Sequence, residues 1–221
     1  MRSKLFGIRL PLAVFLISIL AFSLAGYLII HITLMGNLTE DGNYLHINMK
    51  TIEFKLPKSW RTPYPYVTPF WENESICAIY LLNAEEDAMT YIIYYKTQES
   101  VQGFLGKQNI TDEFSVAIFE IERFYKWFLN RSQDATLQFV ENGTIKVSKR
   151  QASYSKIQIK NISTSTGENM TYNITGIFIS SLTERNLLEI IFYTWKDQAW
   201  NATYNDFQIL VNSLVVKYES E

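Results

Sequence analysis

The chain has 221 residues, with 20 Lys and Arg against 22 Asp and Glu and a formal net charge of -2. This length suits one domain of ordinary size with its own apolar core, and the lack of a basic surplus excludes nucleic acid as a partner, because neutralising phosphates requires a basic patch. The single cysteine, Cys77, excludes an intramolecular disulfide. It lies in the apolar run 76–82, where a lone cysteine is expected to be a small buried hydrophobe.

An apolar run without charge follows a short basic N-terminus. Residues 10–30 contain no charged side chain, and at ~1.5 Å per residue a helix of this length measures ~31 Å, the thickness of the hydrocarbon core of a bilayer. Basic residues up to Arg9 precede the run, and none follows before Lys50. By the positive-inside rule, we expect a cytoplasmic N-terminus at 1–9, a transmembrane helix at 10–33 and an extracellular remainder.

A cleaved signal peptide is the alternative, because Ser23-Leu24-Ala25 supplies the small residues that a signal peptidase requires. The apolar region of a signal peptide has about 7 to 15 residues. Here the apolar stretch continues past the possible cleavage site to Ile30. The length therefore favours an uncleaved membrane anchor, and the lipid bilayer is an expected partner of the chain.

Glycosylation sequons of the form Asn-x-Ser/Thr are frequent in this sequence. Nine of the 15 asparagines stand in one, where chance would give roughly two or three. They are Asn37, Asn73, Asn109, Asn130, Asn142, Asn161, Asn169, Asn173 and Asn201. All nine follow the apolar run, as expected for a chain glycosylated outside the membrane. Glycosylation on an oxidising side without disulfides fits an archaeal cell-surface protein.

The rest of the chain predicts one extracellular domain at 44–221, preceded by a polar juxtamembrane linker at 34–43. Alternation of apolar and polar residues is typical of half-buried strands. We expect strands at 52–56, 75–82, 88–97, 137–141, 144–149, 153–162, 170–180 and 186–195. The pair Asn142-Gly143 and residues 166–169 are typical of turns, and an antiparallel meander is the expected topology.

Two helices are expected among these strands. Over 111–130 the apolar residues recur with a period of 3.6, and Thr111 or Asp112 can cap the first turn. A second helix is expected at about 203–214, with Phe207 and other apolar residues on one face. The order of strands, helix, strands and helix predicts the α+β class, with an antiparallel sheet packed against two helices.

The segment Phe54-Lys55-Leu56-Pro57-Lys58-Ser59-Trp60 resembles the opening of PsbP-like domains, in which a strand runs into a Pro-x-x-Trp turn. The closing segment Asn212-Ser213-Leu214-Val215-Val216 is similar to the end of the same family. Ser59 departs from the pattern, since Gly or Asn is commoner there. The resemblance covers 44–218 and implies a central antiparallel sheet between helices. It also implies a non-catalytic binding or assembly module, and it carries over no catalytic residue and no named partner.

Few residues of the outer domain are suited to catalysis or metal binding. His46 is its one histidine, so a histidine-based zinc site or a Ser-His-Asp triad is not expected, and His46 is predicted to be an ordinary strand residue. The run Glu85-Glu86-Asp87 could hold Ca²⁺ but is typical of a solvated loop. Glu189 could face a pocket and titrate at high pH, although strand alternation favours an outward direction.

The segment 60–71 is the best candidate contact site. It contains three of the five prolines, which exclude a regular helix or a central strand and predict a stiff loop. Rings held on a stiff loop lose little freedom on binding, which suits a protein or glycan partner. The rings are Trp60, Tyr64, Tyr66, Phe70 and Trp71. In the alternative interpretation, the loop covers one end of the sheet and its rings lie in the core.

Three functions remain open from the sequence. The first is a single-pass, membrane-anchored extracellular glycoprotein that acts as a non-catalytic binding or assembly module and contacts an envelope protein or glycan. The second is a carboxylate-dependent envelope hydrolase that uses Glu189 and a second acid. The third is a purely structural surface glycoprotein. We expect no catalytic residues, no metal and no cofactor for the first function.

Overall fold

The computed structural model describes residues 4–5, 8–9, 38–61, 70–83, 85, 87–106, 108, 110–130, 132, 134–163, 171–196 and 198–217. The transmembrane helix expected at 10–33 lies outside the described residues. Of the helices within the described ranges, none is both long and apolar enough to cross a membrane.

Antiparallel strands form most of the described chain. The larger sheet contains β6 (Trp60–Arg61), β7 (Phe70–Glu72), β8 (Ile76–Asn83), β9 (Ala88–Tyr95), β10 (Thr136–Val147), β11 (Arg150–Ser163), β12 (Thr171–Leu182) and β13 (Leu187–Thr194). The smaller sheet contains β3 (Leu38–Asp41), β4 (Tyr44–Asn48), β5 (Ile52–Pro57) and β14 (Val215–Val216). A separate hairpin pairs β1 (Lys4–Leu5) with β2 (Ile8–Arg9). The described helices are α2 (Gln98–Leu105), α3 (Glu113–Leu129) and α4 (Ala199–Ser213).

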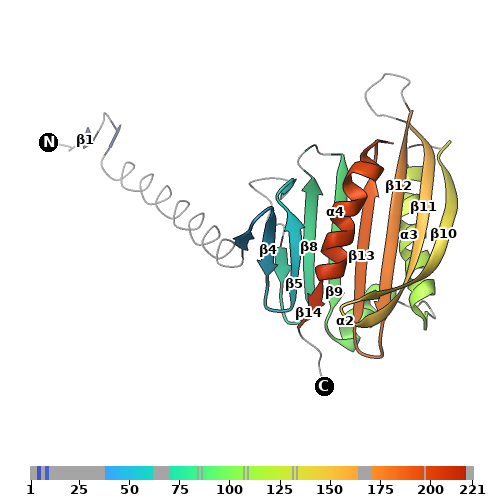
Figure 1. Cartoon of the computed structure of the whole chain (residues 1–221), viewed down its shortest axis with the longest axis horizontal. Coiled ribbons are helices and arrows are strands. Elements are labelled where there is room, and N and C mark those ends of the chain that lie inside the picture. Colours follow the sequence, from blue (N-terminus) through green and yellow to red (C-terminus); the bar gives the residue numbers. More distant parts are fainter. Residues whose placement is uncertain are drawn as a thin grey trace.

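The strand order of the larger sheet is β10-β11-β12-β13-β9-β8-β6, and β7 also pairs with β8. The strands from β10 to β13 form the meander that the sequence predicts, because each pairs antiparallel with the next. The chain leaves this sheet after β9, forms α2 and α3, and re-enters at the far edge with β10. Figure 1 shows that α4 crosses one face of the sheet while α3 lies behind it. We call these faces the α4 face and the α3 face.

Each face of the larger sheet is covered by its own apolar cluster. On the α4 face, Phe207 and Leu210 of α4 pack with Phe54 of the smaller sheet and Phe192 of β13. The smaller sheet is thereby joined to the larger one through α4. On the α3 face, Ile121 of α3 and its neighbours pack on β11 and β12. The described domain is therefore an α+β structure whose main sheet lies between helices.

The β10–β11 hairpin differs from the prediction. We expected a turn at Asn142-Gly143, but both residues lie inside β10, and the turn is at Ser148-Lys149. Gly143 is needed for a packing reason, since a Cβ there would come within 2.7 Å of the Tyr154 ring on β11. An Asn-Gly pair signals a turn in an isolated sequence. In the folded sheet, Asn142 and Gly143 instead continue β10, and the Tyr154 ring packs against the glycine.

A further helix, α2, was not predicted. It begins after Thr97, whose Oγ1 accepts from the Ser100 N–H at 3.2 Å, while the Thr97 N–H donates to Ser100 Oγ. This reciprocal cap is a signal that the sequence contains. Gly103 in the interior of so short a segment weakens the helical pattern, since glycine disfavours helix interiors. The packing of Val101 and Leu105 against Tyr95 stabilises the helix in the fold.

Candidate functional site

Trp60, the first ring of the predicted contact segment, lies in the core. It belongs to β6 and only 2% of its surface is exposed. Its indole Nε1–H donates to Asp206 Oδ2 of α4 at 3.1 Å, and its ring lies 6.2 Å from that of Phe192. This agrees with the alternative interpretation, in which a ring of the segment is part of the core. Trp60 is therefore not available to a partner.

The remaining rings of the segment are placed differently. Tyr64 and Tyr66 lie outside the described residues, and Phe70 is the first residue of β7, with only its backbone described. Trp71 follows in the same strand and is 54% exposed. Of the five predicted contact residues, Trp71 is the one whose described side chain is open to solvent.

Trp71 lies at the end of a row of aromatic side chains on the α3 face. It is opposite Ala78 on β8, and strand alternation places Tyr80 two residues along on the same face. Tyr80 is opposite Tyr91 on β9, with ring centroids 4.7 Å apart, and Tyr91 stacks on Tyr193 of β13 at 6.2 Å. We call Trp71, Tyr80, Tyr91 and Tyr193 the aromatic row. It crosses four strands, from the sheet edge towards α3.

The three phenols of the row are joined by hydrogen bonds. Tyr91 shares hydrogen bonds with Tyr80 and Tyr193, and the Tyr193 hydroxyl donates to Met89 Sδ at 2.9 Å. Burial raises the pKa of Tyr193 to about 12 and that of Tyr91 above its ordinary value. Tyr91 and Tyr193 are therefore neutral at physiological pH. They are held in fixed orientations, as suits a binding surface.

An ion pair fixes the strand that carries Trp71. Burial raises the pKa of the Glu72 carboxyl, but bonds from Lys96 and Thr51 outweigh this effect and hold the pKa below its usual range. Lys96 Nζ lies 2.7 Å from Glu72 Oε1 and 2.7 Å from the carbonyl oxygen of Asn73. The Thr51 hydroxyl donates to the same carboxylate. Since charge-assisted bonds are strong, β7 holds Trp71 on a rigid support.

Sequence reasoning missed Tyr80, Tyr91 and Tyr193. Each of these tyrosines lies in a predicted strand, so strand alternation alone predicts which neighbours in its own strand share its face. What was missing is the strand order, because β7, β8, β9 and β13 become neighbours only in the folded sheet. The row could not be assembled without that pairing.

Glu189 is buried, so the predicted outward direction was wrong. It lies on β13 with 2% of its surface exposed, and its Cα pairs with those of Ser180 and Ile93 on the neighbouring strands. Burial, followed by the nearby Glu120 carboxylate, raises the pKa of Glu189 well above its usual range, while Arg123 opposes the shift. Arg123 itself is paired with Glu120 at 2.6 Å. The result is a pair of carboxyl groups between α3 and the sheet.

The other predicted side chains have structural contacts. Cys77 is fully buried, as predicted, and burial raises the pKa of its thiol to about 12. His46 lies in β4, which confirms it as a strand residue. Asp87 is buried rather than solvated, because Asn83 Nδ2 donates to its carboxylate at 2.6 Å. Within the described residues, no group of three or more His, Cys, Asp or Glu side chains is placed to hold a metal ion.

Six of the nine sequon asparagines are described. Asn73, Asn130, Asn142, Asn161 and Asn201 are exposed, and Asn173 is partly buried. Asn37, Asn109 and Asn169 lie outside the described residues. The Asn173 side chain accepts a hydrogen bond from the Asn161 N–H at 3.3 Å, so these two sequons are neighbours on adjacent strands.

No family model and no curated protein matches this chain. Solved structures similar to it include the PsbP protein (CyanoP) of Synechocystis sp. PCC 6803, at 11% identity and a TM-score of 0.48 over 80% of this chain and 95% of that one. Another is the Ran-binding protein Mog1p of Saccharomyces cerevisiae, at 9% identity and a TM-score of 0.49 over 79% and 95%. A third is LpqN of Mycobacterium tuberculosis, involved in cell envelope biogenesis. It has 10% sequence identity and a TM-score of 0.36, over 81% of this chain and 88% of that one. These likenesses concern the course of the chain.

Proposed function

We propose that the protein is a single-pass, membrane-anchored extracellular glycoprotein of an archaeal type, with a PsbP-like outer domain. In this proposal it acts as a non-catalytic binding or assembly module at the cell envelope. The apolar run at 10–30, the basic residues before it and the nine sequons after it support the location. The aromatic row supports the binding role.

The observation that carries the binding role is the exposure of Trp71 on a fixed strand. Tryptophan and tyrosine are enriched in the centres of interfaces, and Trp71 lies at the end of a row of further aromatic rings. The row adds three phenols whose rings are already ordered, so binding costs little side-chain entropy. Flat rings of this kind suit an envelope protein or a glycan.

The hydrolase alternative loses support from the burial of Glu189. A general acid must come within hydrogen-bond distance of its substrate. With 2% of its surface exposed, Glu189 is covered by α3 and the sheet, and its partner Glu120 is paired with Arg123. Among the described residues, the burial of Glu189 does not support a role for it as the general acid of a hydrolase.

The test is cross-linking mass spectrometry on the full chain in its own membranes, with wild type compared with Trp71→Ala. We expect a stoichiometric neighbour in wild type and at least about a tenfold lower cross-link yield in the variant, since truncating a central interface tryptophan costs about 2 kcal/mol or more and each 1.4 kcal/mol is tenfold. Trp127→Ala is the matched control, because Trp127 lies on α3 and is 49% exposed. We expect that variant to behave like wild type.

Two results would contradict the proposal. Equal cross-link yields from wild type and Trp71→Ala would remove the aromatic row as the contact. Glycopeptides without any specific neighbour would favour a purely structural surface glycoprotein. Competition by soluble envelope glycan fragments would identify a glycan partner rather than a protein.

A further inference from the structure

An open groove lies where the end of α4 meets the β10–β11 turn. Its volume is about 590 Å³, within the range of small-molecule sites. Lys146, Lys149 and Lys217 line it together with an apolar floor formed by Val211 and residues 214–216. Val215 is 42% exposed, so part of that floor is in contact with water.

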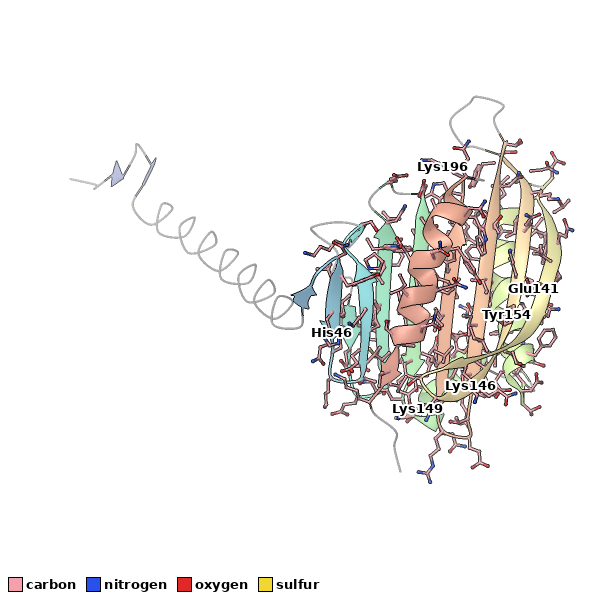
Figure 2. All side chains as sticks on the ribbon, in the orientation of Figure 1. His46, Glu141, Lys146, Lys149, Tyr154 and Lys196 are labelled. Atoms are coloured by element: carbon pink, nitrogen blue, oxygen red, sulfur yellow. The ribbon has the colours of Figure 1, made fainter. Side chains whose placement is uncertain are left out.

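Among the described residues, part of the positive charge of the groove has no ion-pair partner. Lys217 is engaged, since its Nζ lies 2.8 Å from Glu53 Oε2. Among the described residues, no carboxylate forms an ion pair with Lys146 or Lys149. Figure 2 shows these two lysines at the same end of the molecule, opposite the end that carries Lys196. Two ammonium groups beside an apolar floor favour a ligand with a negative head and an apolar part.

The turn that presents Lys149 has a strained backbone. Ser148 and Lys149 have φ values of 51° and 65°, in the left-handed region that glycine and asparagine tolerate best. The turn is held in place by the Val216 N–H, which donates to Ser148 Oγ at 2.7 Å. These two residues form the two-residue loop between Val147 and Arg150, and positive φ at both positions is what the favoured hairpin turn requires. The turn thereby presents Lys149 beside the groove.

We propose that this groove binds an amphiphilic anion. Its phosphate or carboxylate head is held by Lys146 and Lys149 through charge-assisted hydrogen bonds, and its apolar part lies on Val211 and residues 214–216. The proposal is independent of the aromatic row, because no residue of the row lines the groove. Failure of one proposal therefore leaves the other standing.

The probe is hexyl phosphate, titrated calorimetrically into the full chain in phosphatidylcholine nanodiscs, with empty nanodiscs as the blank. We expect saturable binding that weakens in 0.5 M NaCl because salt screens the charges, and no saturable binding of hexanol, which lacks the head. The double variant Lys146→Gln, Lys149→Gln should bind at least about tenfold more weakly. Lys196→Gln is the matched control and should bind like wild type.

Binding that is equal in wild type and in the double variant would overturn the proposal, and so would the absence of saturable heat in wild type. Inorganic phosphate should bind more weakly than hexyl phosphate, since it cannot use the apolar floor. Equal affinities would overturn the amphiphilic part of the proposal.

Lys149→Gly separates function from folding. Glycine relieves the positive φ, so this variant should melt at a higher temperature than wild type while binding hexyl phosphate more weakly. A variant that is more stable and binds equally well would contradict a role for Lys149. Phosphatidylglycerol added to the nanodiscs identifies the source of the ligand. Competition with hexyl phosphate would support a lipid headgroup, and no competition would support a soluble amphiphile.

Discussion

Glu189 carries a carboxyl group that the fold removes from water. Its Oε1 atom has no hydrogen-bond partner among the described residues, and Arg123, the cation that opposes its pKa shift, is paired with Glu120. An ionised carboxylate in such a place would be costly, so the group keeps its proton and its pKa rises. Burial also raises the pKa of Glu120, although the neighbouring Arg123 lowers it in part. The pair is therefore a source of instability at neutral pH.

The sign of this effect follows from linkage. At acid pH the Glu189 carboxyl is protonated in both the folded and the unfolded chain, so its ionisation does not lower the free energy of unfolding. As the pH rises above the ordinary value of 4.5, the unfolded chain releases this proton while the folded chain retains it. The contribution of Glu189 to stability therefore falls with rising pH until the raised folded pKa is reached.

Glu189→Gln should remove that dependence, because glutamine has no proton to lose. We expect the variant to melt at least about 2 °C higher than wild type at pH 8 and to differ less at pH 4. The measurement is thermal unfolding of the full chain at both pH values. Glu122→Gln, an exposed position on α3, is the control and should have little effect at either pH. A gain that is equal at both pH values would contradict the linkage argument.

At the scale of elements, two glycines illustrate opposite roles. Gly143 lies in β10 against the Tyr154 ring, and the Tyr154 hydroxyl donates to Glu141 Oε1 at 2.5 Å. Figure 2 labels Tyr154 and Glu141, which lie near each other. Gly103 lies inside α2, and a Cβ there would meet nothing within 4 Å. The first glycine is required by packing, whereas the second only weakens its helix.

Substitution of each glycine by alanine should therefore act in opposite directions. Gly143→Ala should destabilise the domain by about 1 kcal/mol, because the new methyl group displaces the outer end of the partly exposed Tyr154 ring. Gly103→Ala should stabilise it by about 0.5–1 kcal/mol through the higher helix propensity of alanine. Chemical denaturation of the full chain measures both. If Gly143→Ala is as destabilising in a Tyr154→Ala background, the ring is not the cause.

On the scale of the whole molecule, the described sequons are distributed over the domain. Asn73 follows β7, Asn130 ends α3, and Asn142, Asn161 and Asn201 lie in β10, β11 and α4. All five are exposed, so a glycan at each would project into solvent. Asn173 is partly buried and uses its side-chain oxygen to bind the Asn161 N–H.

We therefore expect unequal occupancy if glycans are added to the folded domain. Asn173 should be the least occupied of the described sequons, because its amide must leave a hydrogen bond and a partly covered position to react. Glycopeptide mass spectrometry of protein purified from its own membranes measures the occupancy of each site. Occupancy at Asn173 equal to that at Asn201 would contradict this expectation, and bare sequons throughout would remove glycosylation from the proposed function.

Much of the architecture could be read from local pattern. Alternation marked β5, β8, β9, β11, β12 and β13, and a period of 3.6 marked α3 and most of α4, because these signals depend only on neighbours in the chain. Burial of Cys77 followed from its apolar run. The burial of Glu189 could not be predicted in this way. Alternation assigns each strand residue to one of the two faces of the sheet, but it does not show that helices or loops cover both faces.

The sequence by itself determined the type of most of the longer elements, the meander from β10 to β13 and the presence of an apolar run long enough to span a bilayer. Only the tertiary structure decided which side chains meet. It put Trp60 in the core and Trp71 in solvent, although both belong to one proline-rich segment, because Asp206 of α4 binds one indole and β7 turns the other to the α3 face. Contacts between distant residues depend on strand order and helix placement, and no local period encodes either of them.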